Sequence, residues 1–168
     1  MAGIIHAFLS ADHRRLDDLL AAATDAGIDV PAYQAFRAGL LRHIGMEEKV
    51  LLPAAKRLLG GTPPDSARQM RLDHGALVAL LVPTPTPDLV AKLRALLELH
   101  NALEEDPGGL YDVCERATGA EAAAIVGAME AAPQVPVVAH FDGERSRASI
   151  ERLLALAGRL QPASPVGE

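Results

Sequence analysis

Residues 12–20 read DHRRLDDLL, and residues 73–81 read DHGALVALL. Each of these segments is followed by a longer one that carries a second histidine, RHIGMEEKVLLPAAKRLLGG at 42–61 and LHNALEEDPGGLYDVCERATG at 99–119. The apolar residues of all four segments recur with the spacing of amphipathic helices. The chain therefore reads as two copies of a helical hairpin, and it predicts an all-α fold built on an up-down-up-down four-helix bundle.

Turn residues mark the limits of these helices. Glycine and proline clusters separate segments that keep a helical period. Pro53 is expected either to kink the second helix or to shift its hydrogen bonding. The expected helices span residues 4 to about 26, 30 to the break at 60–64, about 66–82, and 88 onwards with an interruption at 107–109.

The last third of the chain is expected to extend the bundle rather than to form a separate unit. Residues 1–118 are predicted to make the four-helix bundle, and residues 119–168 a C-terminal helical extension packed on the same domain. Within the extension, additional helices are expected at about 120–131 and 144–157. The segment PQVPVVAHFD (133–142) lies between them and is expected to form an extended strap across the bundle.

Composition excludes several classes of function. Only 3% of the residues are aromatic, Trp is absent and the net charge is −6, so a nucleic-acid surface is not expected. No uncharged apolar run reaches the length of a membrane span. The single Cys114 cannot form an intrachain disulfide, and the N-terminus lacks the pattern of a signal peptide. The expectation is a cytoplasmic protein that binds neither nucleic acid nor membrane.

The histidines carry the clearest chemical pattern. Two segments repeat one spacing: an Asp-His pair, a second histidine 30 or 26 residues later, and a glutamate four residues beyond that. On a helix, residues i and i+4 lie on one face, so each second histidine and its glutamate project together. The doubled pattern predicts a carboxylate-bridged site for two metal ions inside the bundle. The residues expected to bind metal are His13, His43 and Glu47 in the first hairpin and His74, His100 and Glu104 in the second.

The donor set indicates which metals and ligands would fit. Four imidazoles and two bridging carboxylates leave two octahedral ions under-filled. Room remains for a bridging oxo or hydroxo group and for an exogenous ligand such as oxygen, nitric oxide or peroxide. Iron is the first choice and manganese the second, since zinc prefers closed tetrahedral or three-ligand sites. A single His-x-x-x-Glu pair is common on helix surfaces, but two matched pairs on alternate helices favour a metal site.

On these six residues the chain resembles hemerythrin-like proteins of the His-His-Glu (HHE) cation-binding class. The resemblance covers residues 4 to about 118. It implies a non-haem di-iron centre inside a four-helix bundle. In that centre one iron would take His13 and His43, the other His74 and His100, and both glutamates would bridge the two ions.

The chain departs from the oxygen carriers of that class in its nitrogen ligands. Those proteins have a further histidine one turn after the third-helix ligand, where this chain has Val78, and the matching position after His13 is Asp17. Their last carboxylate lies five residues after the fourth-helix histidine; here both Glu104 and Glu105 are available, and symmetry selects Glu104. Fewer nitrogen ligands open a further position and make the two metals more alike, which disfavours reversible oxygen carriage.

Three functions remain open. The first is binding or sensing of oxygen or nitric oxide at an open di-iron site, which predicts binding without turnover and a change of shape in residues 119–168. The second is a di-iron enzyme acting on peroxide or nitric oxide, which predicts turnover. The third is iron storage or delivery, which predicts weakly held, exchangeable iron. The expected partner is a small diatomic or peroxide ligand.

Other polar residues have two interpretations each. His140 could supply a fifth nitrogen ligand, although an ordinary loop histidine is preferred, and His6 is expected at the surface or the core edge. Cys114 is expected to be a buried structural cysteine. Adjacent helical positions point about 100° apart, so the acids beside the ligands are expected to cap or face solvent rather than to orient ligands. The residues with such alternatives are Asp12, Asp73, Glu48 and Glu105, and also Tyr33 and Tyr111, which could hydrogen-bond a bound oxygen species or simply pack.

Overall fold

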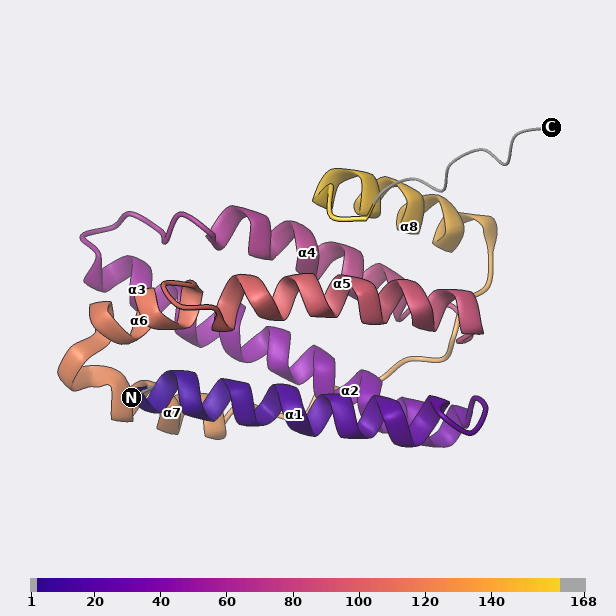
Figure 1. Cartoon of the computed structure of the whole chain (residues 1–168), viewed down its shortest axis with the longest axis horizontal. Helices are drawn as coiled ribbons and strands as arrows, with labels where there is room; N and C mark the ends of the chain where they lie inside the picture. Colours follow the sequence, from indigo (N-terminus) through magenta and orange to yellow (C-terminus); the bar gives the residue numbers. More distant parts are fainter. Residues whose placement is uncertain (1–2, 161–168) are drawn as a thin grey trace.

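The computed structural model describes residues 3–160, and within that range the chain is helical and contains no β-strand (Figure 1). The predicted all-α class is confirmed. None of the helices in this range is long and apolar enough to cross a membrane. The α-helices are α1 (Ile4–Thr24), α2 (Val30–Met46), α3 (Leu52–Leu58), α4 (Ala67–Leu80), α5 (Pro87–Glu105), α6 (Leu110–Thr118), α7 (Ala122–Glu130) and α8 (Glu144–Ala157).

Four of these helices form the bundle, and their direction alternates along the chain. α1 runs beside α2, and α4 runs beside α5, so each predicted hairpin is a pair of antiparallel helices (Figure 1). α1 also contacts α5, which brings the two hairpins together. Short connections between consecutive helices favour antiparallel neighbours. The arrangement is the up-down-up-down bundle that the repeat predicts.

Capping side chains start two of the four bundle helices. Asp29 accepts a hydrogen bond from the backbone N–H of Ala32 at 3.0 Å, and Thr86 accepts one from Leu89 at 3.3 Å. In both helices a proline occupies the first turn, where no N–H is needed. α4 begins differently, because Ser66 occupies its N-cap position but makes no capping hydrogen bond.

Between α2 and α3 the chain forms one wider turn, η1 (Glu47–Leu51), with π-helical hydrogen bonding. Leu52 donates its N–H to the carbonyl of Glu47, five residues back. Pro53 follows at once, and because proline has no N–H, the α-helical ladder cannot continue unchanged there. Of the two effects predicted for Pro53, a kink or a shift of hydrogen bonding, the structure shows the shift. Turns of this kind are frequent at functional sites, and Glu47 is one of the predicted metal ligands.

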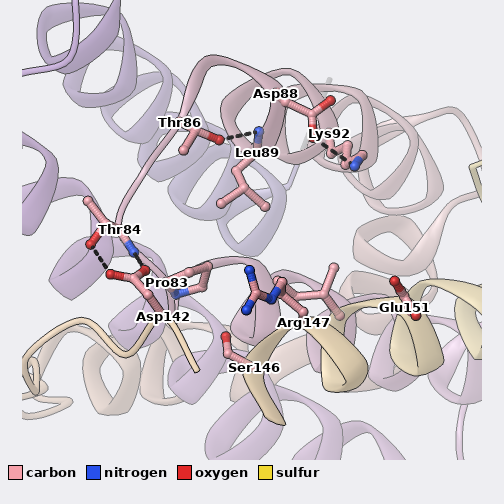
Figure 2. Close-up of a pocket in the computed structure, with 11 residues that line it drawn as sticks. Pro83, Thr84, Thr86, Asp88, Leu89, Lys92, Asp142, Ser146, Arg147 and Glu151 are labelled. Carbon is pink, nitrogen blue, oxygen red and sulfur yellow. Dashed lines mark hydrogen bonds and ion pairs between the residues drawn. The ribbon is translucent and has the colours of Figure 1, made fainter. Parts of the chain in front are cut away.

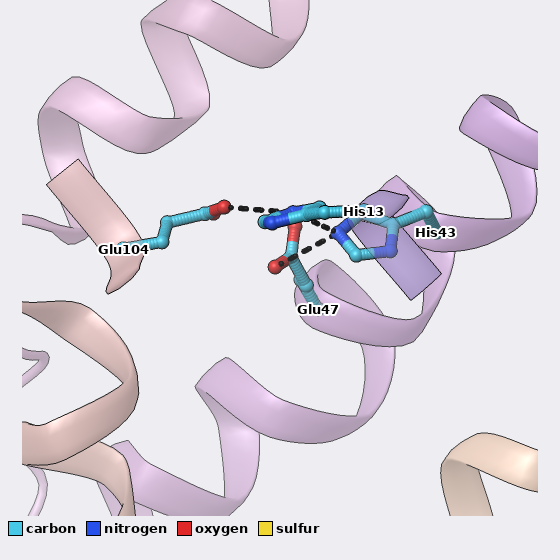
Figure 3. Close-up of side chains that lie close together, drawn as sticks. All are labelled: His13, His43, Glu47 and Glu104. Atoms are coloured by element: carbon cyan, nitrogen blue, oxygen red, sulfur yellow. Dashed lines mark hydrogen bonds and ion pairs between the residues drawn. The ribbon is translucent and has the colours of Figure 1, made fainter. Parts of the chain in front are cut away.

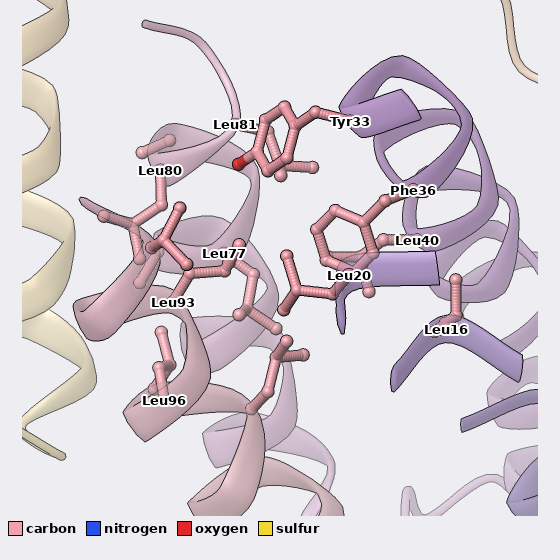
Figure 4. Close-up of a cluster of buried hydrophobic side chains, with 14 of the residues drawn as sticks. Leu16, Leu20, Tyr33, Phe36, Leu40, Leu77, Leu80, Leu81, Leu93 and Leu96 are labelled. Carbon is pink, nitrogen blue, oxygen red and sulfur yellow. The ribbon is translucent and has the colours of Figure 1, made fainter. Parts of the chain in front are cut away.

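The apolar interior is divided into two clusters, with the predicted metal ligands between them along the helices. The first cluster gathers the end of α1, the start of α2, the end of α4 and the start of α5; it includes Leu20, Phe36, Leu77 and Leu93 (Figure 4). The second gathers the opposite ends of these helices with α6 and α7; it includes Ile5, Met46, Met70 and Ile125. A buried polar layer therefore has apolar packing on both sides, which restricts access of water to it.

The C-terminal segment covers the bundle on two sides. α6 and α7 pack against α1, whereas α8 packs against α4 (Figure 1). Residues 132–142 have no regular secondary structure and join α7 to α8. Arg42 of α2 donates to the carbonyl of Ala132 at 3.1 Å, and Arg37 donates to that of Val138 at 3.0 Å. The predicted strap therefore lies along α2, while the division of the chain at residue 118 stays a prediction.

The end of the strap is fixed beside the start of α5. Asp142 accepts hydrogen bonds from the backbone N–H of Thr84 at 2.7 Å and from its hydroxyl at 2.8 Å (Figure 2). Next to this contact, a recess of about 360 Å³ lies between the first turns of α5 and the first turns of α8 (Figure 2). α8 itself packs chiefly against α4.

Candidate metal centre

The six residues predicted to bind metal come together in the middle of the bundle. α1, α2 and the π turn provide those of the first hairpin, while α4 and α5 provide those of the second. All six are buried, and none is more than 4% exposed. They form two overlapping groups in which the candidate ligand atoms lie within 4.8 Å of one another. The groups are His13, His43, Glu47 and Glu104 (Figure 3), and Glu47, His74, His100 and Glu104.

The two glutamates belong to both groups, and each divides its oxygens between the two hairpins. Glu47 places Oε1 3.3 Å from Nε2 of His43 and Oε2 3.2 Å from Nε2 of His74. Glu104 places Oε1 3.2 Å from Nε2 of His100, and its Oε2 is 3.3 Å from the first-hairpin imidazole on α1. A carboxylate in this arrangement can bridge two cations, one beside each pair of imidazoles.

Each imidazole contacts a further carboxylate through its outer nitrogen. The four pairs, each joining Nδ1 to a carboxylate oxygen, are His43 with Asp12 (2.8 Å), His74 with Glu48 (2.8 Å), His100 with Asp73 (3.4 Å) and His13 with Glu105. The expectation that these four acids cap or face solvent is wrong. Adjacent positions do point about 100° apart, but in a bundle that direction faces the neighbouring helix, where another histidine lies. Partners of this kind fix the ring orientation and the tautomer.

The contact between Nδ1 and a carboxylate determines whether Nε2 of the same ring carries a proton or a lone pair. A neutral imidazole that donates Nδ1–H to a carboxylate has a lone pair on Nε2. Nε2 of His13 lies 2.9 Å from Nε2 of His43, a separation at which two lone pairs repel unless a proton or a metal ion lies between them. On the other side of the centre, five buried atoms have no hydrogen-bond partner: Nδ1 and Nε2 of His100, Nε2 of His74, Oε2 of Glu47 and Oε1 of Glu104. Buried acceptors without partners cost free energy, and a bound cation would satisfy those other than Nδ1 of His100.

Without a metal ion the same cluster attracts protons. Burial by itself would lower the pKa of His13, but Glu104 and Glu105 outweigh it and raise the pKa to about 10. His74 is affected in the same way, because burial is outweighed by carboxylates, Glu47 first, that raise its pKa to about 9. Burial would raise the pKa of Glu47, yet the neighbouring histidines hold it well below its usual range. The centre favours positive charge, so protons and metal ions compete for the same lone pairs.

A family model described as the hemerythrin HHE cation binding domain matches residues 4–144. The chain belongs to the hemerythrin HHE cation-binding family. The predicted resemblance is confirmed, and the matched region extends beyond the bundle through α7 and the strap to the first residue of α8. No curated protein and no solved structure matches the chain. The buried His and Glu groups fit the cation binding that the family's description names.

One further residue of this hemerythrin HHE centre is Tyr111, whose role the sequence left open. Tyr111 is fully buried on α6, and its hydroxyl donates to Oε1 of Glu47 at 2.6 Å. The hydroxyl oxygen of Tyr111 also lies 3.1 Å from Oε2 of Glu104 and 3.2 Å from Nε2 of His13. Burial, together with the charges of the two glutamates, raises the pKa of Tyr111 well above its ordinary value. The only signal in the sequence was its spacing of two helical turns from Glu104, which the glycine-rich break between α5 and α6 obscured.

The other candidates lie outside the hemerythrin HHE centre. The ring of His140 stacks on Tyr33 with a centroid separation of 6.3 Å, and neither residue belongs to the two groups of candidate ligands. His6 packs edge-on against Tyr111 with a centroid separation of 5.8 Å, at the edge of the core. Cys114 is buried in the second apolar cluster, as predicted, and burial raises the pKa of its thiol to about 12. Of these residues, only Tyr111 is positioned to act at the centre.

A small cavity adjoins the hemerythrin HHE centre. It has a volume of about 10 Å³ and is bordered by His13, His43 and His100. This volume is close to the 10–15 Å³ that a single water molecule requires. A recess of about 310 Å³ on the surface between α1 and α5 shares three lining residues with the cavity. The shared residues, Asp17, Leu97 and Asn101, therefore lie between the cavity and solvent.

Proposed function

We propose that this chain binds two iron ions at the six-residue centre and takes a small ligand, oxygen or nitric oxide, at an open position beside them. The observation that carries the proposal is the sharing of both glutamates between the two imidazole pairs. Each glutamate directs one oxygen to each hairpin, at 3.2–3.3 Å from the imidazole nitrogens. A pair of shared carboxylates is suited to two cations rather than one.

The donor set favours iron, with manganese as the alternative. Imidazole nitrogens and carboxylate oxygens suit first-row metals of octahedral preference, whereas zinc prefers fewer ligands. Bound iron supplies affinity for oxygen and nitric oxide that the protein side chains lack. The absence of an extra histidine at Val78 and Asp17 leaves ligand positions that the chain does not fill. A cytoplasmic location is part of the proposal, because a reducing compartment fits both the lone Cys114 and ferrous iron.

The cavity supports a small ligand. Its apolar lining consists of leucines from three helices, and its polar lining combines histidines of the centre with Asp17 and Asn101, which lie towards the surface recess. A bulky molecule would not fit a volume of about 10 Å³. The leucines that line the cavity are Leu16, Leu40 and Leu97.

Tyr111 favours a second candidate, an enzyme acting on peroxide or nitric oxide. Its hydroxyl is held by Glu47 at 2.6 Å in a buried site, where it can donate a hydrogen bond or a proton to a bound ligand. A carrier or sensor needs no such proton donor. Iron storage is less well supported, because the candidate ligands are at most 4% exposed and rapid exchange of the metal requires access.

The test is metal analysis of the purified chain combined with an optical spectrum. About two irons per chain, with absorption bands that shift when azide or nitric oxide is added, would support the open di-iron site. Consumption of hydrogen peroxide with catalytic turnover would favour the enzyme. A chain that retains no metal after loading, or a spectrum that added ligands leave unchanged, would contradict the proposal.

A further inference from the structure

One of the four carboxylates that contact the outer imidazole nitrogens differs from the other three in its surroundings. The side chains of Asp12, Glu48 and Glu105 are 12%, 31% and 32% exposed, whereas that of Asp73 is fully buried. A buried carboxylate requires partners for both oxygens. One oxygen of Asp73 lies 3.4 Å from Nδ1 of His100, and its further partners come from outside the metal centre.

The C-terminal segment provides these partners, directly and through one side chain of α4. Arg159 donates from Nε to Oδ2 of Asp73 at 3.1 Å, and from Nη2 to the carbonyl of Leu99 at 3.1 Å. Gln69 donates to Oδ1 of Asp73 at 2.8 Å and also to the carbonyl of Ala157, the last residue of α8, at 2.8 Å. Both links connect the end of α8 to the carboxylate beside the metal centre.

The equivalent carboxylate of the first hairpin has only a local partner. Arg15 donates to Asp12 at 2.7 Å from three residues along the same helix, and its side chain is 46% exposed. Asp12 contacts His43 as Asp73 contacts His100, so the two halves match up to this point. Beyond it the symmetry between these two carboxylates ends, because Asp73 is connected to the end of α8, whereas Asp12 has a partner on its own helix.

We propose that docking of α8 and binding of the metal ion beside His74 and His100 are coupled, with Arg159 as the positioning residue. The coupling rests on the proposed metal-binding function. With α8 docked, Arg159 holds the carboxylate of Asp73 in place, 3.4 Å from Nδ1 of His100, so that it limits the rotation of the His100 ring. With α8 detached, Asp73 gains water and the ring loses a fixed partner. Because coupling between two sites is reciprocal, the bound ion also strengthens the docking of α8.

α8 lies on the outside of the bundle and contributes few fully buried side chains to it. It packs chiefly against α4, and a recess of about 360 Å³ lies between its first turns and the start of α5 (Figure 2). Only Ser146, Ile150 and Ala157 of this helix are buried, and its other connection is the irregular strap. Elements with few buried groups open at a lower free energy than the core. Whether the centre holds its metal ion would thereby determine whether α8 is docked on the surface of the bundle or detached from it.

The first experiment measures metal retention by the whole chain loaded with ferrous iron. Arg159→Ala is expected to weaken retention of one ion by about tenfold against a chelator, the lower end of the effect for partners of metal-bound histidines. The other ion is expected to be retained as in the wild type. Arg159→Lys keeps the charge and is expected to recover part of the affinity. Arg152→Ala, at an exposed position on α8, is the matched control and is expected to retain both ions.

The second experiment measures amide hydrogen exchange with and without ferrous iron. In the wild type, exchange over α8 is expected to slow when iron is bound. Arg159→Ala is expected to remove this difference while leaving the protection of α1 and α2 by iron intact. If that variant does not fold, Gln69→Ala breaks the neighbouring link from α4 and has the same expected outcome.

Two results would overturn the coupling. One is equal retention of both ions by Arg159→Ala and the wild type. The other is a rate of amide hydrogen exchange over α8 in the wild type that is the same with and without iron. Either result would leave the proposed metal-binding function intact, because both measurements require a wild-type chain that holds iron. A wild-type chain that holds no iron would instead remove the proposed function and this coupling together.

Discussion

Asp12 is the neighbour of His13 in the sequence, but its carboxylate contacts His43 on the next helix, with Oδ2 2.8 Å from Nδ1. The second hairpin repeats the relationship, since Asp73 contacts His100 rather than its own neighbour. In each Asp-His pair the histidine thus provides an imidazole to the centre. The aspartate contacts the imidazole on the next helix of the same hairpin, so each residue of the repeated dipeptide has its own role.

The symmetry of the centre predicts equal effects of two substitutions. His43→Ala and His100→Ala each remove one imidazole from one half, and each is expected to lower the iron content to a similar degree. The measurement is iron per chain after loading and desalting. If only one of the two variants lost metal, the two halves would not be equivalent and the shared-glutamate arrangement would be wrong.

Asp12→Asn removes the charge that orients His43 while keeping the side-chain shape. Because such partners set ring orientation and basicity, iron affinity is expected to fall by about 10- to 100-fold. A chelator competition assay measures the change. Asp18→Asn, at an exposed position on the same helix, is the control and is expected to retain wild-type affinity. Unchanged affinity in Asp12→Asn would mean that the 2.8 Å contact has no influence on the metal.

Tyr111→Phe keeps the buried ring and removes only the hydroxyl. Both irons are expected to bind, but the optical response to azide or nitric oxide is expected to change, because the donor beside Glu47 is lost. In the metal-free chain, loss of the hydroxyl is expected to cost about 1–3 kcal/mol, since buried acceptors lose their partner. Tyr33→Phe, whose ring packs against Phe36 away from the centre, is the control. Identical ligand titrations for Tyr111→Phe and the wild type would show that Tyr111 only packs.

The raised pKa values of two histidines predict how the stability of the metal-free chain depends on pH. In the folded chain the pKa of His13 is about 10 and that of His74 is about 9. The ordinary pKa of a histidine, taken here for the unfolded chain, is 6.5. The folded chain therefore binds more protons than the unfolded chain between these values. The contribution of the two histidines to the free energy of unfolding is complete below about pH 6.5. It is lost as the pH rises through 9 and 10, by at most about 1.4 kcal/mol per pH unit for each histidine.

Urea unfolding in the presence of a chelator, at several values between pH 6.5 and 9, measures this dependence. The midpoint is expected to fall steadily as the pH rises. Bound iron would displace the protons, so the loaded chain is expected to lose this dependence and to bind iron more weakly in acid. A metal-free chain that becomes more stable over the same interval would contradict the assigned charges.

Leu97→Phe adds volume where the small cavity and the surface recess meet. Iron content is expected to stay at the wild-type level, whereas the rate of azide or nitric oxide binding is expected to fall, because the added ring fills the route to the centre. Stopped-flow spectroscopy measures the rate. Leu99→Phe, at a position 39% exposed on the same helix, is the control. Wild-type binding rates in Leu97→Phe would place the ligand route elsewhere.

The sequence by itself determined the helices, their order and the six candidate ligands. These features are local: a helical period, a turn rich in glycine or proline, and a spacing of four residues each specify geometry within one helix. The duplication of the pattern added the information that two hairpins are equivalent. The sequence also predicted that Pro53 would either kink its helix or shift its hydrogen bonding, and the structure shows the shift as the π turn that begins at Glu47.

Only the tertiary structure decided which groups meet across helices. Asp12 and Asp73 were expected to cap helices or face solvent, yet each faces the next helix, because the rotation and separation of packed helices determine what lies about 100° from a ligand. The approach of Tyr111 and the connection from Arg159 to Asp73 depend on how α6 and α8 fold back onto the bundle. No spacing along the chain encodes these contacts, since they arise from the packing of segments distant in sequence.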